Sequence, residues 1–371
     1  MANPYHNRPF YTFWKSGVAE QTDVDPVVSA TLSLSRDDAI ATAGSCFAQH
    51  LSRTIMHQGF NYLVTEAYQE RPGTVDENYS VFPARFGNVY TSRQLLQLFD
   101  RAYGLFQPKV DWWRGRQGEI IDPFRPRIQA AGFPDVDSMR ADRELHLAAV
   151  REMFERCKVF IFTLGLTETW LSKVDGSAFP LAPGVVATEP PGDEAEFHNL
   201  GAAEVIKDLE EFLEKFSFVN PSANVILTIS PVALIATYED RHVLVSTIAS
   251  KSILRAAAED ICRRYKQVNY FPSYEIIVGP QNGGRFYAPD LREVAPEGVD
   301  YVMSIFSRHY LLDESTHAAT IEPRADGKSK NAFNTPKPSS NARSTSPISE
   351  RDMKRLKDVT KIICDEEAIV K

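Results

Sequence analysis

The feature that most constrains the fold is an alternation between short β-type runs and longer helical patterns. The clearest runs are KVFIFTL at 158–164 and NVILTI at 224–229, and each ends at small or polar residues. Between them, apolar residues from Val205 to Phe216 recur at three- and four-residue spacing, which predicts an amphipathic helix. Because strands that alternate with helices usually form a parallel sheet covered by those helices, the sequence predicts an α/β fold.

Weaker patterns continue the same alternation along the chain. We expect further strands at 38–43, 60–64 and 268–271, and helices at 46–58, 246–265 and 296–311, with one more helix that starts at Thr91 or Ser92 and runs through Phe99. Two segments interrupt the alternation because they are rich in Pro and Gly: residues 105–136 and 174–195. The first is expected to be a long loop or cap, and the second a hairpin or an ordered loop.

Length and composition predict one large domain followed by a tail. The chain has 371 residues, of which 43% are hydrophobic, so a sizeable core is possible. From residue 314 to 349 the composition turns to Ser, Asn, Pro, Lys and Arg, which is typical of a disordered linker. We therefore expect a domain at 1–313, a flexible linker at 314–349 and a short terminal helix within 350–371.

Charge and cysteine usage narrow the classes of partner and compartment. A net charge of -8 argues against nucleic acid, since binding phosphates requires clustered Lys and Arg. No stretch approaches the roughly 18 apolar residues of a membrane span, and the polar start of the chain does not resemble a secretory signal. The four cysteines lack CxxC spacing, which favours reduced thiols and a cytoplasmic protein: Cys46, Cys157, Cys262 and Cys364. Neither metal-ligand spacing nor a dinucleotide-binding motif is present.

Small and polar residues follow the predicted strands where these end. They are Gly44-Ser45-Cys46, Gly165-Leu166-Thr167-Glu168, Ser230-Pro231 and Ser273-Tyr274-Glu275. Ligands of open parallel sheets bind beyond this edge, so we expect the site there. Ser45 follows a glycine at a strand-to-helix turn, where an exposed hydroxyl near the positive end of a helix suits a nucleophile. The alternative is that Ser45 only caps the helix.

The stretch TAGSCFAQHL at 42–51 resembles the motif that gives the GSCFA family its name. Further blocks resemble the same family: GNVYTSRQLLQLF at 87–99, TLGLTETW at 163–170, ILTISPV at 226–232, RHVLVSTIASKSILRAA at 241–257 and RFYAPDL at 285–291. The resemblance covers about residues 3–310. It implies a relation to SGNH/GDSL-type hydrolases, whose fold is a flavodoxin-like three-layer sandwich and whose members are esterases, lipases and some acyltransferases.

The resemblance also implies roles for individual residues. Ser45, after Gly44, would be the nucleophile, and its backbone N–H would be one donor to the oxyanion. Gly87, or Gly87 with Asn88, would stand for the glycine of the second motif of SGNH hydrolases, and Asn88 would be a further donor to the oxyanion. The alternative is that Gly87 and Asn88 only form a turn before Tyr90. Gly165, Thr167 and Glu168 fall where the third motif of SGNH hydrolases, Gly-x-Asn-Asp, is expected. Thr167 stands in place of the Asn that binds the oxyanion in that motif.

The general base is the main departure from the family pattern. Asp290 and Glu293 stand where an Asp-x-x-His pair is expected, and a glutamate is a weak base for a serine hydroxyl because its unperturbed pKa is about 4.3. His242 is a second candidate base, with a role at a helix start as the alternative. Cys46 is an alternative nucleophile or a small buried residue. Ser250-Lys251-Ser252 is similar to a Ser–Lys dyad, but it lies inside a predicted amphipathic helix, so a surface lysine or a phosphate contact is the favoured interpretation of Lys251.

Two functions follow from these residues. The first is a serine esterase or O-acyltransferase that acts on an acyl ester of a glycan or small metabolite. It would use no cofactor as an esterase, and acyl-coenzyme A is a possible donor for a transferase. The second is a non-catalytic relative that keeps the pocket to bind a ligand, which the missing histidine and the Thr at 167 favour. Neither a nucleic acid nor a membrane is an expected partner.

Overall fold

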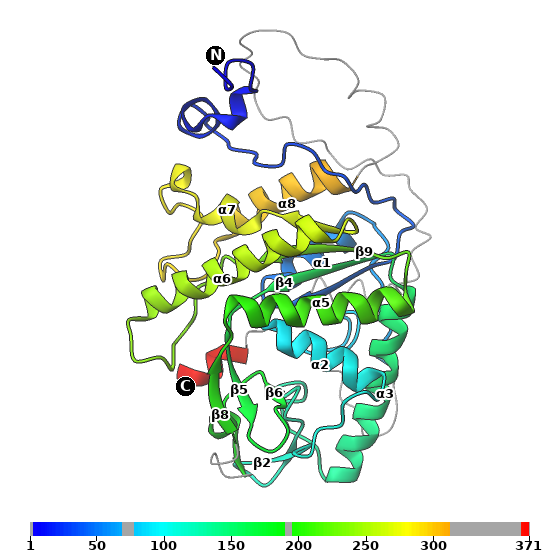
Figure 1. The fold of residues 1–371 in the computed structure, drawn as a ribbon. Helices are drawn as coiled ribbons and strands as arrows, with labels where there is room; N and C mark the ends of the chain where they lie inside the picture. The colour runs from blue at the N-terminus through cyan, green and yellow to red at the C-terminus, as the bar shows by residue number, and fades with distance from the viewer. Residues whose placement is uncertain (1–2, 69–77, 190–194, 312–364, 371) are drawn as a thin grey trace.

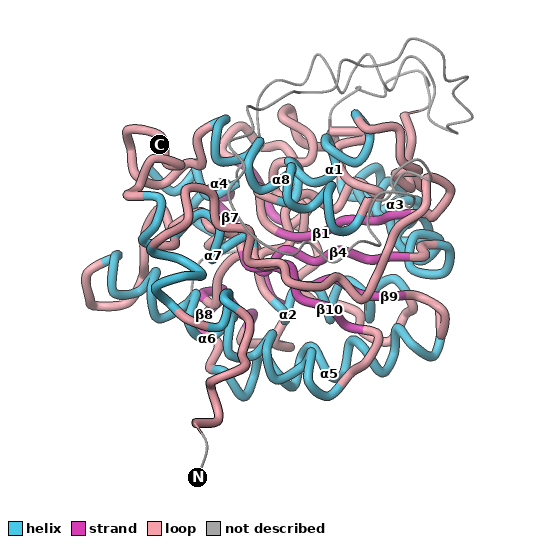
Figure 2. The backbone as a smooth tube through the Cα atoms, turned by 90° about the horizontal axis from the view of Figure 1, so that it is seen from above, coloured by secondary structure: helices cyan, strands magenta, loops and turns pink. Residues whose placement is uncertain are grey.

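The computed structural model describes residues 3–68, 78–189, 195–311 and 365–370. Its centre is a four-stranded parallel sheet with the strand order β1-β4-β9-β10 (Figures 1 and 2). The strands are β1 (Ile40–Gly44), β4 (Val159–Leu164), β9 (Asn224–Ile229) and β10 (Val268–Phe271). The predicted α/β fold with a parallel sheet is confirmed, and the two clearest apolar runs are the central strands.

Alternate residues of the central strands face opposite layers, as the two-residue period of a strand requires. Residues of one parity, such as Ile40, Ile161 and Ile226, belong to one apolar cluster. Their neighbours in sequence, such as Ala41 and Phe162, belong to a second cluster on the other face. Both faces of the sheet are therefore buried, which explains why β4 and β9 have continuous apolar sequences instead of alternating ones.

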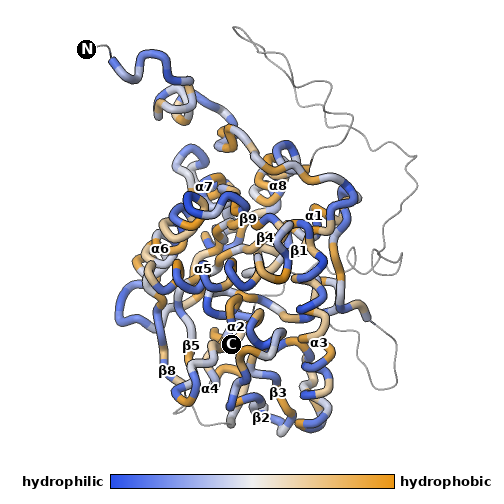
Figure 3. The backbone as a smooth tube through the Cα atoms, turned by 45° about the vertical axis from the view of Figure 1, so that its right-hand side comes forward, coloured by the Kyte–Doolittle hydropathy of each residue, from blue (hydrophilic) through white to orange (hydrophobic). Residues whose placement is uncertain are grey.

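Helices cover both faces and complete a three-layer sandwich (Figure 2). One layer contains α1 (Ala48–His57), α7 (Ser273–Val278) and α8 (Pro296–Tyr310). The other contains α2 (Ser92–Ala102), α3 (Val136–Arg156), α5 (Ala202–Val219) and α6 (Val243–Arg264). Along α5, hydrophobic and hydrophilic residues alternate with the turns of the helix (Figure 3), since Leu209, Phe212 and Phe216 are buried against the sheet.

Local sequence signals explain several element boundaries. Of the two residues at which this helix was expected to start, Thr91 is the one that caps α2, and it forms a capping box with Gln94. The predicted strand at 60–64 is reduced to a single parallel bridge between Tyr62 and Ile40, on the side of β1 opposite to β4. Helix α3 was not predicted, although Asp135 caps it by accepting a hydrogen bond from the Ser138 N–H at 2.7 Å.

The two segments expected to be loops contain short strands. The first provides β2 (Trp113–Gly115) and β3 (Ile120–Ile121), and the second provides β6 (Ala178–Phe179), helix α4 (Pro183–Val186) and β7 (Ala187–Glu189). Strand β2 pairs with both β3 and β7, so the two insertions form one small sheet. A third sheet contains β5 (Glu168–Ser172) between β6 and β8 (Ala195–Asn199).

Short helical turns complete the described chain, at Phe10–Thr12, Lys15–Ala19, Pro280–Asn282 and Asp365–Val370. The last of these, here named the tail segment, is red in Figure 1 and packs against α4. The predicted linker at 314–349 and the predicted helix from Glu350 to Cys364 lie outside the described residues. Within the described ranges, no helix combines the length and apolarity that crossing a bilayer would need.

Candidate active site

Ser45 lies at the carboxyl end of β1, directly after Gly44. Gly44 has a φ of 140°, and a Cβ at this position would lie 2.4 Å from the Thr163 carbonyl oxygen, so only glycine fits. The Ser45 backbone N–H donates to the same Thr163 oxygen at 3.1 Å. This N–H therefore continues the sheet in this structure and does not point to an oxyanion, in contrast to the expected role.

The Ser45 side chain faces a small cavity. The residue is only 3% exposed, and among the described residues its Oγ has no hydrogen-bond partner. The cavity has a volume of about 220 Å³ and is also lined by Cys46, Gly165, Lys251 and Glu366. A buried hydroxyl without a partner costs on the order of 1–3 kcal/mol, and such groups in native proteins call for an explanation such as a catalytic role.

Backbone hydrogen bonds hold three segments around this serine. The Val89 N–H donates to the Gly44 carbonyl at 2.8 Å, and the Gly165 N–H donates to the Tyr90 carbonyl at 2.9 Å. A Cβ on Gly165 would lie 3.1 Å from the Ser45 Cβ, so a glycine allows this close approach. The ends of β1 and β4 and the strand-like segment before α2 thus meet at one point, as the sequence predicted.

Lys251 is the residue at this site that sequence reasoning misjudged. It is 1% exposed, lines the Ser45 cavity, and donates from Nζ to the Gly165 carbonyl oxygen at 2.5 Å. Burial lowers the pKa of its amine to about 8, although the charges of Glu366 and Cys46 act in the opposite direction. The expectation of a surface lysine is wrong because this side of α6 faces the site.

The pattern of α6 contains a signal for this burial. Its inward residues include Ser246, Ser250 and Lys251 as well as Leu254, Ala258 and Ile261. Lys251, Leu254 and Ala258 follow the three- and four-residue spacing of one helix face. The burial of Lys251 can be predicted if polar residues are allowed on the inward face of a helix near a sheet edge. A pattern of apolar residues alone does not predict it.

Neither of the two candidate bases, His242 and Glu293, lines the Ser45 cavity, and Asp290 does not line it either. His242 is exposed and caps α6, where its Nδ1 accepts a hydrogen bond from the Leu244 N–H at 3.1 Å. Asp290 and Glu293 are exposed as well, and the Asp290 carboxylate accepts from the Glu293 N–H at 3.0 Å. This hydrogen bond closes a turn between Asp290 and Glu293, and neither side chain lines the cavity of Ser45.

Thr167 and Glu168 have structural contacts and do not line this cavity. The Thr167 hydroxyl donates to the Asn199 Oδ1 at 2.7 Å. The Glu168 carboxylate accepts from the Tyr238 N–H at 3.1 Å, which joins β5 to the loop before α6. The hydroxyl of Thr167 is therefore engaged by Asn199 in this structure.

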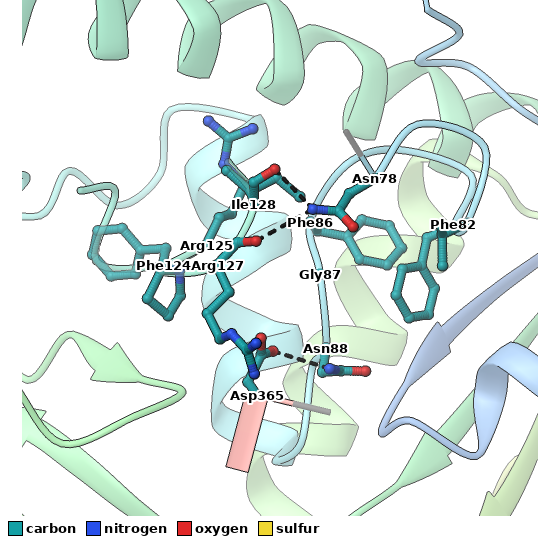
Figure 4. Close-up of a pocket in the computed structure, with 12 residues that line it drawn as sticks. Asn78, Phe82, Phe86, Gly87, Asn88, Phe124, Arg125, Arg127, Ile128 and Asp365 are labelled. Atoms are coloured by element: carbon teal, nitrogen blue, oxygen red, sulfur yellow. Dashed lines mark hydrogen bonds between the residues drawn. The ribbon is translucent and has the colours of Figure 1, made fainter. Parts of the chain in front are cut away.

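Asn88 lies at the same end of β1 as Ser45, since its neighbour Val89 is bonded to Gly44. Its Oδ1 accepts from Gln49 at 3.3 Å, and its Nδ2 donates to the Asp365 carboxylate at 3.0 Å. Figure 4 shows this contact at one end of a second cavity of about 380 Å³, which Gly87 also lines. Gln49 thus fixes the orientation of the amide, so that its N–H group faces an acidic side chain.

The tail segment brings two acidic residues to the site that the sequence did not indicate. Asp365 is bonded to Asn88, and Glu366 lines the Ser45 cavity while pairing with Arg292 at 3.0 Å. Arg292 lies in the turn formed by Asp290 and Glu293. The turn at 290–293, which was expected to supply the general base, thus places Arg292 beside Glu366 instead.

No metal site is formed by the part of the chain that the structure describes, where no three His, Cys, Asp or Glu side chains are grouped suitably. The residues around Ser45 are a hydroxyl, a thiol, an amine and carboxylates, which suit nucleophilic and acid–base chemistry.

Fold and site together define an α/β sandwich protein with a buried serine and a buried lysine at the carboxyl edge of its sheet. A family model described as the GSCFA family matches residues 39–306, and the chain belongs to this family. The resemblance seen in the sequence is confirmed. No curated protein matches the chain in sequence.

Several solved structures are similar at low identity. A mutant acetyl esterase solved with an acetate ion is 10% identical with a TM-score of 0.33, and the match covers 73% of this chain and 95% of that one. A carbohydrate esterase of family 3 from Talaromyces cellulolyticus is 9% identical with a TM-score of 0.32 and the same coverage, 73% and 95%. A candidate platelet activating factor from Streptococcus pneumonia is 12% identical with a TM-score of 0.26, and the match covers 45% of this chain and 64% of that one.

Proposed function

We propose that this protein is a serine esterase or O-acyltransferase in which Ser45 is the nucleophile and Lys251 is the general base. One observation carries the proposal: the buried, unpartnered hydroxyl of Ser45 shares a cavity with a buried lysine. Burial lowers the pKa of that lysine to about 8, so a useful fraction of the amine is neutral near neutral pH. A base whose pKa lies near the working pH is the most effective for proton transfer.

The proposed reaction has two halves. In the first, the neutral Lys251 amine takes the Ser45 proton while Oγ forms a bond to the acyl carbon of an ester. The resulting ammonium then returns this proton to the leaving alkoxide as the carbon–oxygen bond breaks, which leaves an acyl-serine. In the second half, a water or an acceptor hydroxyl loses its proton to Lys251 and attacks the acyl carbon. The bond between this carbon and Oγ then breaks, and the Lys251 ammonium returns the proton to Oγ, which regenerates the Ser45 hydroxyl and the neutral amine.

Lys251 meets the chemical requirement that the predicted bases do not. His242 caps a helix and Glu293 is exposed, whereas Lys251 lines the cavity of the nucleophile. Its amine is held on the Gly165 carbonyl, and Gly165 is also the residue packed against the Ser45 Cβ. A short shift of the amine along this carbonyl is the motion that the proposal requires.

The proposed oxyanion donor is the amide of Asn88, with Gln49 as its positioning residue. This amide already donates to a carboxylate oxygen, that of Asp365, so its N–H is aimed at negative charge. An oxyanion donor of this kind contributes about 3–4 kcal/mol to the stability of a transition state.

The proposed substrate is an acyl ester of a glycan or small metabolite with a short acyl group, because the cavity beside Ser45 is only about 220 Å³. If the protein is a transferase, acyl-coenzyme A is the proposed donor. Cys157 and Cys262 are free thiols within the described residues, which supports the proposal of a reducing, cytoplasmic location.

Fluorophosphonate labelling followed by peptide mapping tests the proposal. We expect an adduct on the peptide that contains Ser45, which disappears in Ser45→Ala and persists in Cys46→Ala. An adduct that persists in Ser45→Ala and is lost in Cys46→Ala would assign the nucleophile to Cys46, which lines the same cavity.

The second candidate function is ligand binding without catalysis. The observation that favours it is that the Ser45 hydroxyl makes no hydrogen bond to Lys251 or to any other described base. No labelling of the wild type between about pH 6 and pH 9, in a protein that still binds short-chain esters, would support this function over the enzyme.

A further inference from the structure

The tail segment is held at the site by its acidic side chains. Asp365 and Glu366 are 5% and 7% exposed, although both are carboxylic acids. Burying a carboxylate is costly unless donors or cations compensate for the lost water, so the surface that receives these two residues must supply such groups.

Asp365 is bound by groups of the segment that precedes α2. The side chain and backbone of Asn88 donate to its carboxylate, the side chain at 3.0 Å, and the Asp365 N–H donates to the Tyr90 hydroxyl at 3.1 Å. Burial raises the pKa of Asp365, whereas the hydrogen bonds from Asn88 and the charge of Arg127, whose guanidinium extends toward the same carboxylate (Figure 4), act in the opposite direction. The groups around Asp365 thus form a carboxylate-binding pocket.

Glu366 lies in the cavity of Ser45 and is bound there by an arginine. Its Oε2 pairs with Arg292 at 3.0 Å, and the side chain lines the Ser45 cavity together with Lys251. Of these two adjacent carboxylates, that of Glu366 lies in the Ser45 cavity, and that of Asp365 lies in the second cavity on the amide of Asn88. The groups that face these carboxylates are the amide of Asn88 and the guanidinium groups of Arg127 and Arg292, and all three belong to the folded domain.

We infer that the Ser45 site binds carboxylate-bearing ligands, and that the tail segment occupies it in competition with an acyl substrate that carries a negative charge. The inference rests on the proposed function for the role of Ser45, and it adds the chemical class of the substrate. In this arrangement Asp365 and Glu366 stand in for the substrate's acidic groups. Substrate binding requires the tail segment to leave.

The test uses the full chain and succinate, a small dicarboxylate, as the probe. The variant Asp365→Asn/Glu366→Gln weakens the hold of the tail segment without removing it, and calorimetry then measures succinate binding. We expect succinate to bind this variant at least tenfold more tightly than the wild type. The matched control is Glu144→Gln/Glu214→Gln, which removes two exposed acids on α3 and α5 and should leave the affinity unchanged.

Hydrogen exchange provides a second readout that does not depend on the variant. Succinate added to the wild type should increase amide exchange in residues 365–370, because the ligand displaces them. Arg292→Gln should weaken succinate binding at least tenfold. Equal succinate affinity in the wild type and the tail variant, no succinate binding in either, or binding without increased exchange of the tail segment would overturn the inference.

Labelling of Ser45 separates the two proposals. Faster fluorophosphonate labelling in the tail variant supports both, and slower labelling would show that Glu366 belongs to the catalytic machinery, which would overturn the inference. Succinate binding with displacement of the tail, but without labelling of Ser45 in either protein, would leave the carboxylate site standing and refute the proposed function. Labelling of Ser45 without succinate binding would refute the carboxylate site and leave the proposed function standing.

Discussion

Two of the regions in which the protein buries charged groups compensate for this burial differently. Between α2 and α3, the buried Asp122 carboxylate accepts hydrogen bonds from Arg125 and Arg143, each at 2.9 Å. Burial alone would raise the pKa of Asp122, but the two guanidinium groups hold it well below its usual range. At the Ser45 cavity, Lys251 is buried on a carbonyl oxygen and its pKa falls to about 8.

The difference separates stability from reactivity. In the region of Asp122, opposite charges lie within hydrogen-bond distance and both groups stay ionised, which ties the first insertion to α3. At the cavity, burial favours the neutral amine of Lys251, and the Ser45 hydroxyl has no hydrogen-bond partner within the described ranges. Groups that are poorly compensated in the folded state are the ones available to a substrate, and perturbed pKa values gather at such sites for this reason.

The largest expected effect is that of Ser45→Ala. We expect esterase activity and labelling to fall by about 10³-fold or more, because the nucleophile is lost. The melting temperature should stay the same or rise slightly, since the variant removes an unpartnered buried hydroxyl. Labelling and calorimetry on the same preparation check both parts, and a stability loss comparable to the activity loss would mean that Ser45 is a structural residue.

Lys251→Met should lower the rate by about 10²–10⁴-fold, the usual contribution of a general base. It should leave the melting temperature unchanged or higher, because a thioether replaces an amine that burial disfavours. Lys207→Met, an exposed lysine on α5, is the matched control for the loss of a positive charge. Wild-type rates in Lys251→Met would exclude this residue as the base.

Asp122→Asn should show the opposite pattern from the two variants at the cavity. Loss of the carboxylate leaves Arg125 and Arg143 buried without their partner, which should cost about 3–5 kcal/mol in the free energy of unfolding. Urea denaturation measures this, with the exposed Asp137→Asn in the first turn of α3 as the control. The labelling rate of the folded fraction should not change. A stable Asp122→Asn variant would contradict the contrast between the regions.

The smallest expected effect is that of Thr167→Val. Because the Thr167 hydroxyl donates to Asn199, its loss should cost about 1 kcal/mol of stability and leave the labelling rate within about threefold of wild type. A rate decrease of about 10²–10³-fold would instead identify Thr167 as the oxyanion donor that the family pattern implied.

Sequence patterns were sufficient for the sheet and for the position of Ser45. The strands at 159–164 and 224–229 are short apolar runs with clear ends, and Gly44 marks the turn after β1, so local signals determine these features. Helix α3 was missed because its buried residues, such as Met139 and Val150, are separated by charged ones and follow a Pro-rich segment.

The proposed base and the acidic residues of the tail segment could not be predicted in the same way. Whether Lys251 is buried depends on which side of α6 faces the edge of the sheet, and this is a property of the tertiary structure. Asp365 and Glu366 reach the site from a segment beyond the predicted domain, with no local signal to relate them to Asn88 or Arg292.

The pH dependence of Ser45 labelling is the most direct test of the lysine's role. The base is the neutral amine, and its pKa is lowered to about 8, so the neutral fraction grows as the pH rises through this value. The wild-type rate should increase by about tenfold per pH unit below about pH 8 and level off above it, whereas Lys251→Met should be slow and lack this step. A wild-type profile without a step near pH 8, or the same step in Lys251→Met, would show that Lys251 does not activate Ser45.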